Sequence, residues 1–486
     1  MTVCRFGVDA ISVRQTGVAV CSLVLWLALT VELSAQAYSE YPLPQYTASP
    51  YTVPGRTSAD TGLDPQVPVG GYAASAGYSA WDAGPQAPPA GPMMAEPTWF
   101  DTSDGVETSW IGLDTPTTWS MLDFQNRQSE KELTVLESQQ SQCTYPRLIV
   151  GAQFRASALL GKTNTADAFP YMGRFPPDFH GKSVSDLRLL QSNQDVIAHV
   201  SPWVSGYAET LFSDVFTFPT FQQGSWQVRQ AYAVIGNLNE SPFYAFIGKK
   251  NVNFGDMRTL SPFTQSIVWH YFGALAEGGG VGYSQNGLNL SFTALNGSRG
   301  IRVVDSPRGG RINNFAANGS YEFSFPWGDL MLGGGYIDGT IYNGSVAEHT
   351  SPQITGPQNG AWDVNGRLRW DRWYFSGEYV TTERRWPVTN HRVNALRAEV
   401  ACDYPLGTVP AWWAMSWSAG VQGPLGAEFD KNEQFVIGVE LQPSPNVLFT
   451  VEYVRSMGFA PLINITTASD RSVRQNSLVF GLVLAI

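Results

Sequence analysis

From about residue 146 to its end, the chain alternates apolar and polar side chains along short runs. In the run 311–325, Phe315, Tyr321 and Phe323 share one face of an extended chain, and Asn314 and Asn318 share the other. A period of two residues is typical of β-strands whose two faces meet different environments. The pattern predicts about sixteen strands, near 146–160, 184–200, 203–214, 225–236, 242–251, 274–285, 287–297, 311–325, 328–339, 359–370, 372–382, 391–403, 409–421, 432–442, 446–456 and 473–486.

The connections between these strands alternate strictly between short turns and long loops. The short turns are expected around Pro202, Leu238, Asn286–Gly287, Pro326–Gly328, Asp371, Leu406 and Pro443–Pro445. The long loops are expected at 161–183, 215–224, 252–273, 298–310, 340–358, 383–390, 422–431 and 457–472. An up-and-down barrel with both chain ends in the periplasm has this order, with its long loops outside the cell. We therefore predict an all-β, transmembrane, up-and-down antiparallel β-barrel of about sixteen strands.

The two faces of the predicted strands indicate which side of the barrel wall contacts water. Sixteen strands enclose a lumen too wide for side chains to fill, so the polar face should line water and the apolar face should meet lipid. On the strand near 446–456 this places Val451 and Tyr453 outward and Glu452 inward. Aromatic residues at strand ends, consistent with interfacial girdles, include Trp327, Trp370, Trp373 and Trp412.

Composition agrees with a membrane barrel. Charged residues make up only 15% of the chain, against about 25% in an average globular protein, and Gly, Phe, Tyr and Trp are abundant. The same composition would also suit a secreted β-sandwich or β-propeller, which is the alternative to a membrane barrel. The net charge of −11 argues against nucleic acid as a partner.

The N-terminus is typical of an export signal. Arg5 and Arg14 precede the apolar stretch 17–31, and Ala35-Gln36-Ala37 has the small residues of a cleavage site. Residues 1–37 are therefore predicted to be a signal peptide, with an uncleaved anchor helix as the alternative. The mature chain would keep Cys143 and Cys402, either as one disulfide or as two thiols.

Between the signal peptide and the barrel lie two further segments. Residues 38–97 are rich in Pro, Tyr, Gly and Ala, a composition that predicts a disordered periplasmic tether. The tether is either a plain spacer or a contact to the cell wall. Residues 98–145 are mixed, with a short helix expected within 123–142, and 98–122 could tuck into the barrel mouth. The barrel itself spans 146–486.

One hairpin carries a resemblance to a known family. The stretch 228–255 reads VRQAYAVIGNLNESPFYAFIGKKNVNFG, two strands joined by turn chemistry at 236–241. It resembles the core signature of LbtU-type siderophore porins, an outer-membrane β-barrel family. The resemblance implies an outer-membrane location and uptake of a ferric siderophore. Relatives carry a coiled coil before the barrel, which implies homo-oligomers, but 123–142 sustains no heptad here.

The chain shows no recognisable enzyme motif. Its five His residues are scattered, and neither the HExxH zinc motif nor a G-x-S-x-G nucleophile elbow occurs. We therefore expect no enzymatic activity, no metal site and no cofactor.

Charged residues on the predicted inner face are the candidates for function. They could set a transverse field across a constriction and bind a charged solute, or form ion pairs that only stiffen the wall. Of the two adjacent lysines at 249 and 250, the first is expected to face inward. The loop 252–273 is either a constriction loop or a surface loop. The expected pore-lining residues are Arg229, Lys249, Arg367, Arg369, Glu378, Arg397, Glu399, Glu440 and Glu452.

These observations predict an outer-membrane porin for passive uptake of a small solute, with a ferric siderophore as the solute that the resemblance implies. Because no energy-coupled plug domain precedes the barrel, transport should be diffusive. A general or anion-preferring porin is one alternative. A structural or adhesive envelope barrel, anchored by the tether, is another.

Overall fold

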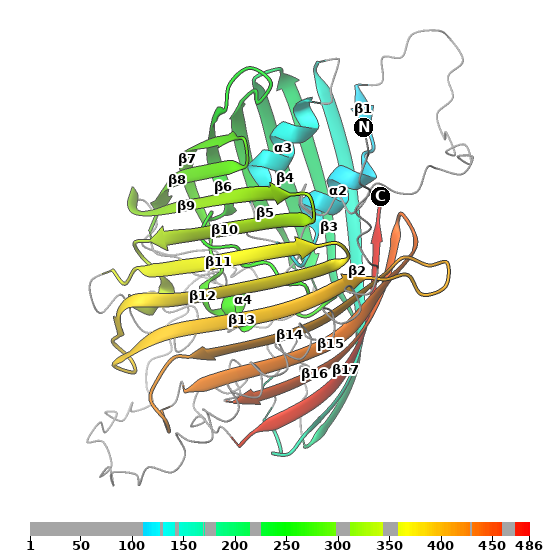
Figure 1. The fold of residues 1–486 in the computed structure, drawn as a ribbon, viewed down its shortest axis with the longest axis vertical. Coiled ribbons are helices and arrows are strands. Elements are labelled where there is room, and N and C mark those ends of the chain that lie inside the picture. The colour runs from blue at the N-terminus through cyan, green and yellow to red at the C-terminus, as the bar shows by residue number, and fades with distance from the viewer. Residues whose placement is uncertain are drawn as a thin grey trace, which may run out of the picture. The chain divides into compact units, whose positions relative to one another are not determined.

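Sixteen long strands follow one another in the computed structural model, and each pairs with its neighbours in sequence (Figure 1). The structure describes residues 110–126, 130–140, 145–168, 170, 181–213, 225–297, 312–343, 358–427, 430–458 and 472–486. The strands are β2 Arg147–Thr163, β3 Ser183–Ser201, β4 Val204–Ser213, β5 Ser225–Gly236, β6 Phe243–Asn251, β7 Leu275–Gln285, β8 Leu288–Asn296, β9 Ile312–Phe325, β10 Gly328–Ile337, β11 Ala361–Trp370, β12 Trp373–Trp386, β13 His391–Asp403, β14 Ala411–Val421, β15 Lys431–Ser444, β16 Val447–Gly458 and β17 Arg474–Ala485.

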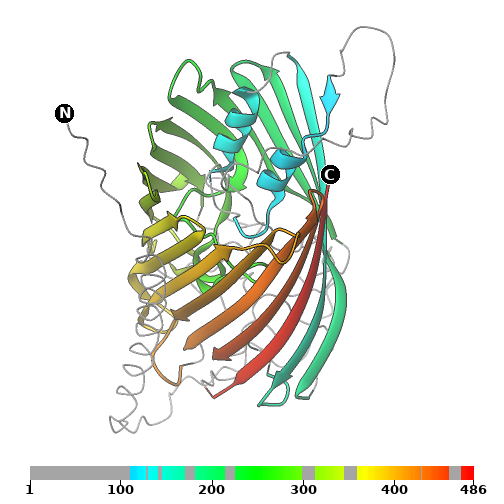
Figure 2. The same ribbon diagram turned by 45° about the vertical axis from the view of Figure 1, so that its right-hand side comes forward.

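The sheet closes into a barrel because its last strand pairs with its first. β17 runs antiparallel to β2, with Ser477 opposite Gly161 and Ala485 opposite Gln153. The other neighbouring pairs, from β2–β3 to β16–β17, are antiparallel too (Figure 2). Closure gives every long strand a neighbour on each side, as a wall in lipid requires. The predicted sixteen-stranded up-and-down antiparallel barrel is confirmed.

The two faces of the wall differ in polarity as the alternation predicts. On β16, Phe449 and Val451 are 46% and 38% exposed, whereas Thr450 and Glu452 are 2% and 0% exposed. Large apolar side chains are exposed on most other strands in the same way, for example Val281, Leu332 and Ile437. The outer surface is therefore largely apolar, and the polar set points inward.

The aromatic residues at the strand ends divide between the two faces. Trp327 and Trp373 are exposed on the outside, in line with an interfacial position. The expectation for Trp412 was wrong. Its indole packs against the ring of Tyr374 at 4.6 Å and donates to the carbonyl of Leu260 at 2.9 Å, inside the barrel.

The connections keep the predicted sides but not the predicted strict alternation in length. The short turns are 202–203, 237–242, 286–287, 326–327, 371–372, 404–410 and 445–446. On the opposite end, the connection 387–390 is shorter than the turn 404–410. The reason is that β12 continues to Trp386, past a register irregularity between Thr381 and Arg385. Residues 383–386 of this extension were predicted to belong to the loop 383–390.

A bulge on β5 reverses the inward face within the hairpin that resembles the porin signature. Glu209 pairs with Gln230, and the next residue of β4, Thr210, pairs with Val228, so Arg229 is an extra residue. As a result Val228 is 51% exposed on the outside, whereas Tyr232 is 5% exposed inside. A single uninterrupted alternation would have put both on one face.

The remaining elements are short. They are β1 Ile111–Gly112, which pairs in parallel with β2, α2 Thr115–Leu122, α3 Lys131–Gln140, α4 Ile267–Phe272 and the single turn η3 Ile341–Asn343. Asp114 caps α2 by accepting from the backbone N–H of Thr117 at 3.1 Å. In the described parts of the chain, no helix has both the length and the apolar character to cross a membrane. The predicted signal peptide and tether lie outside the described residues.

Candidate functional site

The connection between β6 and β7, residues 252–274, folds into the barrel and is called the interior loop below. Its helix α4 packs against β12–β15, although the loop begins at β6 and ends at β7. The backbone N–H of Ile267 donates to Ser418 Oγ at 3.1 Å, and the Tyr271 hydroxyl donates to Asn432 Oδ1 at 2.9 Å. The structure thus favours a constriction loop over a surface loop.

Glutamates of the wall hold the backbone of this loop. Glu378 on β12 accepts from the N–H groups of Asp256 and Met257, at 2.9 and 2.8 Å. Glu399 on β13 accepts from the N–H of Leu260 at 2.9 Å. A carboxylate that accepts two or three donors satisfies backbone groups that the loop cannot pair within itself.

A third glutamate repeats this arrangement farther round the wall. Glu452 on β16 accepts from the N–H groups of Phe263 and Thr264, at 2.6 and 3.2 Å, and from the Thr264 hydroxyl at 2.5 Å. Its side chain points inward, as expected, but the loop covers it completely instead of leaving it in open water. The three carboxylates fix the loop from residue 256 to residue 264.

Arg397 joins two of these carboxylates to the loop. Its guanidinium is fully buried and lies 2.8 Å from Glu378 Oε2, 2.6 Å from Glu399 Oε2 and 2.8 Å from Asp256 Oδ2. Arg367 adds a longer contact, 3.6 Å from Asp256 Oδ1. A buried charge that loses its partner raises the free energy of the folded protein strongly. These ion pairs therefore hold the loop in one position.

The charge state of Asp256 follows from the same cluster. Burial alone would raise the pKa of this carboxyl, but Arg367, Arg258 and Arg397 outweigh burial and lower the pKa below its ordinary value. Asp256 is therefore ionised at neutral pH, and it offsets part of the positive charge of the arginines around it.

The two helices α2 and α3 before the barrel lie inside it (Figure 1). Residues 115–126 and 130–140, called the interior segment below, place Met121, Val135 and Leu136 against the inner wall. The wall is apolar there because the inward positions of β2–β6 near the short turns are Ile149, Ile197, Tyr207, Tyr232, Val234, Tyr244 and Phe246. These side chains would face water if the interior segment were absent.

Polar contacts fix the segment at the short-turn end of the barrel. The indole N–H of Trp119 donates to the carbonyl of Pro445 at 2.7 Å, in the turn between β15 and β16. Gln139 donates to the carbonyl of Pro202 in the turn between β3 and β4. Ser138 Oγ lies 3.2 Å from His199 Nε2. The expectation that 98–122 tucks into the barrel mouth agrees with the contact of Trp119, whereas Ser138 and Gln139 belong to the range 123–142, where a short helix was expected.

An ion pair ties α3 to the start of the interior loop and corrects the expectation for Lys249. Lys250 Nζ lies 2.8 Å from Glu132 Oε2, and Asn253 Nδ2 donates to Glu132 Oε1 at 2.5 Å. Lys250 shares the inner face with Phe246, whereas Lys249 shares the outer face with Ile247, which is 66% exposed. Lys250, and not Lys249, is therefore the lysine inside the barrel.

Glu130 lies at the start of α3, close to Glu132. The Ser291 hydroxyl on β8 donates to Glu130 Oε1 at 3.2 Å. Burial raises the pKa of Glu130 to about 7, and the neighbouring Glu132 carboxylate adds to the rise while Lys250 opposes it. This carboxyl therefore titrates close to neutral pH.

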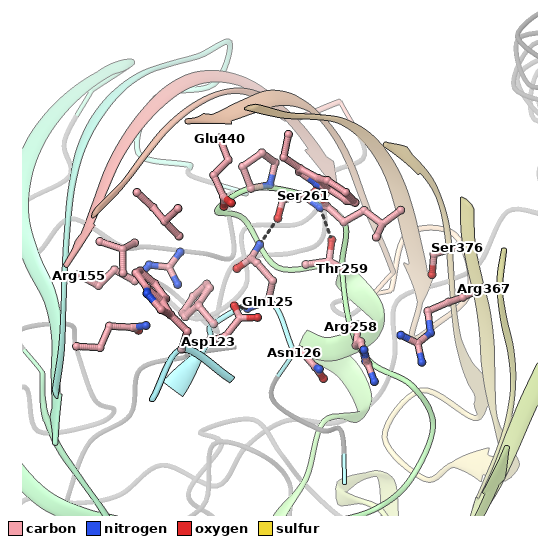
Figure 3. A pocket seen from close by; sticks show the side chains of 18 residues that line it. Asp123, Gln125, Asn126, Arg155, Arg258, Thr259, Ser261, Arg367, Ser376 and Glu440 are labelled. Atoms are coloured by element: carbon pink, nitrogen blue, oxygen red, sulfur yellow. Dashed lines mark hydrogen bonds between the residues drawn. The ribbon is translucent and has the colours of Figure 1, made fainter. Parts of the chain in front are cut away.

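The interior segment and the interior loop meet around a small cavity of about 80 Å³ (Figure 3). The segment contributes Asp123–Asn126, called the tip below, and the loop contributes Arg258–Pro262. Gln125 donates to the carbonyl of Ser261, and the N–H of Thr259 donates to the carbonyl of Gln125 at 3.0 Å. In Figure 3, Arg155 lies on one side of Gln125, with Arg258 and Arg367 on the other.

Of the other expected pore-lining residues, Arg229 and Arg369 lie apart from this cavity. Arg229 on β5 is buried against Glu209, with Nη1 3.0 Å from Oε2. Arg369 on β11 pairs with Asp329 on β10, near the short turns. Glu440 on β15 is 8% exposed and lines the cavity, as does Arg367. The wall charges thus serve largely as pairs and loop anchors, and whether they also select a solute remains a prediction.

Sequence reasoning missed several residues of the site. Asp256 follows the run Asn253-Phe254-Gly255, which was noted only for its resemblance, and Glu132 belongs to a helix without apolar periodicity. Gln125 acts through one amide and a backbone carbonyl, which leave no pattern in a sequence. Among these residues, only Lys250 had a signal in the sequence. Adjacent side chains on a strand point to opposite faces, so one of the two lysines had to lie inside the barrel.

In the described residues, no group of three or more His, Cys, Asp or Glu side chains could hold a metal ion. Cys402 lies on β13, and Cys143 falls outside the described residues, so their pairing stays untested.

Comparison with known sequences gives little. No protein-family profile matches the chain. The UPF0422 protein of Coxiella burnetii (strain RSA 493 / Nine Mile phase I) is 27% identical over 150 residues, a match that spans 30% of this chain and 30% of that protein's length. The resemblance to LbtU-type porins therefore remains an expectation.

Solved structures of similar architecture include an anion-selective porin and an outer-membrane channel. The anion-selective porin from Comamonas acidovorans is 10% identical, with 70% of this chain and 100% of that chain covered and a TM-score of 0.47. The channel DcaP of Acinetobacter baumannii is 13% identical, with 70% and 97% covered and a TM-score of 0.44. Salmonella typhi OmpF, in complex with daunomycin, is 12% identical, with 70% and 98% covered and a TM-score of 0.46. At such identities the likeness concerns the fold alone.

Proposed function

We propose that this protein is a passive pore of an outer membrane that admits small polar solutes. The observation that carries the proposal is the interior loop, which the wall carboxylates Glu378, Glu399 and Glu452 hold across the inside of a closed barrel. Sixteen strands alone would enclose a wide channel, and a loop fixed across it narrows the channel to a passage for small solutes.

The outer surface supports the membrane location. Side chains such as Ile247, Val364 and Leu332 are at least half exposed, which a protein in water rarely tolerates over a continuous band. Lipid removes this cost, and a closed barrel satisfies its backbone groups there. Large barrels of this kind are typical of bacterial outer membranes.

The filled interior favours small solutes. Both the interior loop and the interior segment occupy the lumen, and the cavity where they meet measures about 80 Å³. So small a space beside the loop and the segment favours small polar solutes over bulky ones. A ferric siderophore, the solute implied by the resemblance of 228–255, would require the tip or the loop to move.

The charges around the cavity leave the preferred sign of the solute open to experiment. Arg155, Arg258 and Arg367 lie at the cavity, and so do the carboxylates Asp123 and Glu440. Asp256 also offsets Arg258 at 3.3 Å. Such a mixture fits a general porin at least as well as an anion-preferring one.

Liposome swelling tests the proposal. Purified protein is refolded into liposomes that contain a trapped polymer, and the liposomes are diluted into isotonic solutions of small amino acids or pentoses. We expect rapid swelling that depends on the amount of folded protein. Liposomes that hold folded barrels and swell no faster than protein-free liposomes would favour the structural or adhesive role.

A further inference from the structure

We propose that the tip of the interior segment, Asp123–Asn126, sets the size limit of the passage by bridging the barrel wall and the interior loop. The proposal rests on the proposed pore function and names the residues that determine its selectivity for size. Phe124 and Gln125 are the two residues whose contacts make the bridge.

Phe124 makes the bridge on the wall side. The guanidinium carbon of Arg155, on β2, lies 3.1 Å from the centre of the Phe124 ring and 3.8 Å from that of Phe263 in the interior loop. Arg155 Nη2 also donates to the carbonyl of Phe263 at 2.7 Å. The two rings and the arginine between them therefore join segment, wall and loop in one stack.

Gln125 makes the bridge on the loop side. Its amide donates to the carbonyl of Ser261, and its own carbonyl accepts from the N–H of Thr259 at 3.0 Å. Gln265 donates to the carbonyl of Phe124. Two of these three contacts run from a side-chain amide to a backbone carbonyl and one joins two backbone groups, so the tip closes the space beside residues 258–262.

The tip can change without loss of the rest of the segment. Met121, Val135 and Leu136 are each at most 3% exposed and hold α2 and α3 on the wall without contacts from the tip. The Asp123 carboxylate accepts from the N–H of Gln125 at 3.0 Å and keeps the local turn. Truncating Phe124 and Gln125 should therefore widen the cavity while α2 and α3 stay in place.

The test compares sugar permeation in liposomes for the wild type, the double variant Phe124→Ala/Gln125→Ala and the control Gln140→Ala. Gln140→Ala removes the same amide from the exposed end of α3. We expect the wild type and the control to admit pentoses and to exclude disaccharides. The double variant should admit disaccharides severalfold faster. An unchanged size limit in a double variant that shows normal barrel folding by heat-modified gel mobility would overturn the proposal.

A second measurement tests the same proposal without the double variant. In a chain with Cys4, Cys21, Cys143 and Cys402 each replaced by Ser, Gln125→Cys is treated with thiol reagents of increasing size, and Gln140→Cys serves as the control. Pentose flux should fall with reagent size at 125 and stay constant at 140. Equal effects at both positions would contradict a role for the tip. If wild-type liposomes admit no sugar at all, the pore function fails first, and this outcome differs from an unchanged size limit.

Discussion

Glu378, Glu399 and Glu452 show what single inward residues do in this barrel. Each accepts hydrogen bonds from backbone N–H groups of the interior loop, and Glu378 and Glu399 also pair with Arg397. Glu452 holds the loop through two backbone N–H groups and the Thr264 hydroxyl, and one substitution tests all three contacts.

Glu452→Ala should loosen the interior loop. The change leaves two backbone N–H groups and the Thr264 hydroxyl without their acceptor, and each buried donor left unpaired costs about 1–3 kcal/mol. We expect faster hydrogen exchange at residues 260–266 and a noisier, larger pore current. Glu240→Ala, in an exposed short turn, is the control and should change neither. Unchanged exchange in Glu452→Ala would show that the carboxylate does not anchor the loop.

Val451→Arg should impair membrane assembly. Val451 is 38% exposed on the outer face of β16, next to the inward Glu452. An arginine at the lipid face near the bilayer midplane costs roughly 2–4 kcal/mol. Urea titration of folding into liposomes should show this loss. Val388→Arg, the same change in the exposed connection 387–390, should fold as the wild type does. Equal folding of both variants would mean that the outer face does not meet lipid.

At the scale of elements, α3 is the part of the molecule whose docking should respond to pH. Glu130 precedes α3, and its pKa is raised to about 7 in the folded protein, from an ordinary value of 4.5. A raised pKa means that the docked state favours the protonated form. Docking of α3 is therefore strongest below pH 4.5 and weakens as the pH rises from 4.5 to about 7.

Hydrogen exchange at residues 131–140 measures this response. Wild type and Glu130→Gln are compared at the same pH, below and above that range, so that the intrinsic pH dependence of exchange cancels. Glu132 and Lys250 face Glu130 in both proteins. We expect the protection of α3 in the wild type to fall relative to the variant as the pH rises. A constant ratio would mean that Glu130 does not titrate there.

The elements also show where sequence patterns succeed and where they fail. All sixteen long strands lie close to their predicted ranges because period-two alternation and turn residues act locally. The bulge at Arg229 escaped prediction because a sequence does not say which strand carries the extra residue. The face of Tyr232 therefore depended on information from the partner strand, whereas Lys250 follows the plain alternation of β6 together with Phe246.

At the scale of the whole molecule, the wall was predictable and its contents were not. The barrel follows from an even number of strands and from the order of turns and loops. The interior loop and the interior segment are held by backbone groups, single amides and an apolar patch on the inner wall of β2–β6. Such contacts depend on distances across the lumen, which local patterns do not contain.

Loss of the protein should have little effect on the use of bulky ferric siderophores if its pore admits only small solutes. A deletion strain is grown under iron limitation with single ferric siderophores and, separately, with small carbon or nitrogen sources at limiting concentration. We expect slower growth on the small solutes and normal growth on the siderophores. Loss of growth on one ferric siderophore, restored by the wild-type chain, would instead support the solute that the resemblance of 228–255 implies.

Single-channel recording in a planar lipid bilayer tests the pore most directly. Folded protein is added to one side, and current is recorded in symmetric salt and then across a salt gradient. We expect discrete, reproducible current steps that scale with salt concentration, of small amplitude because the interior loop and segment fill much of the lumen, and a reversal potential that gives the preferred ion sign. Folded barrels that insert into the bilayer and give no current steps would contradict a pore.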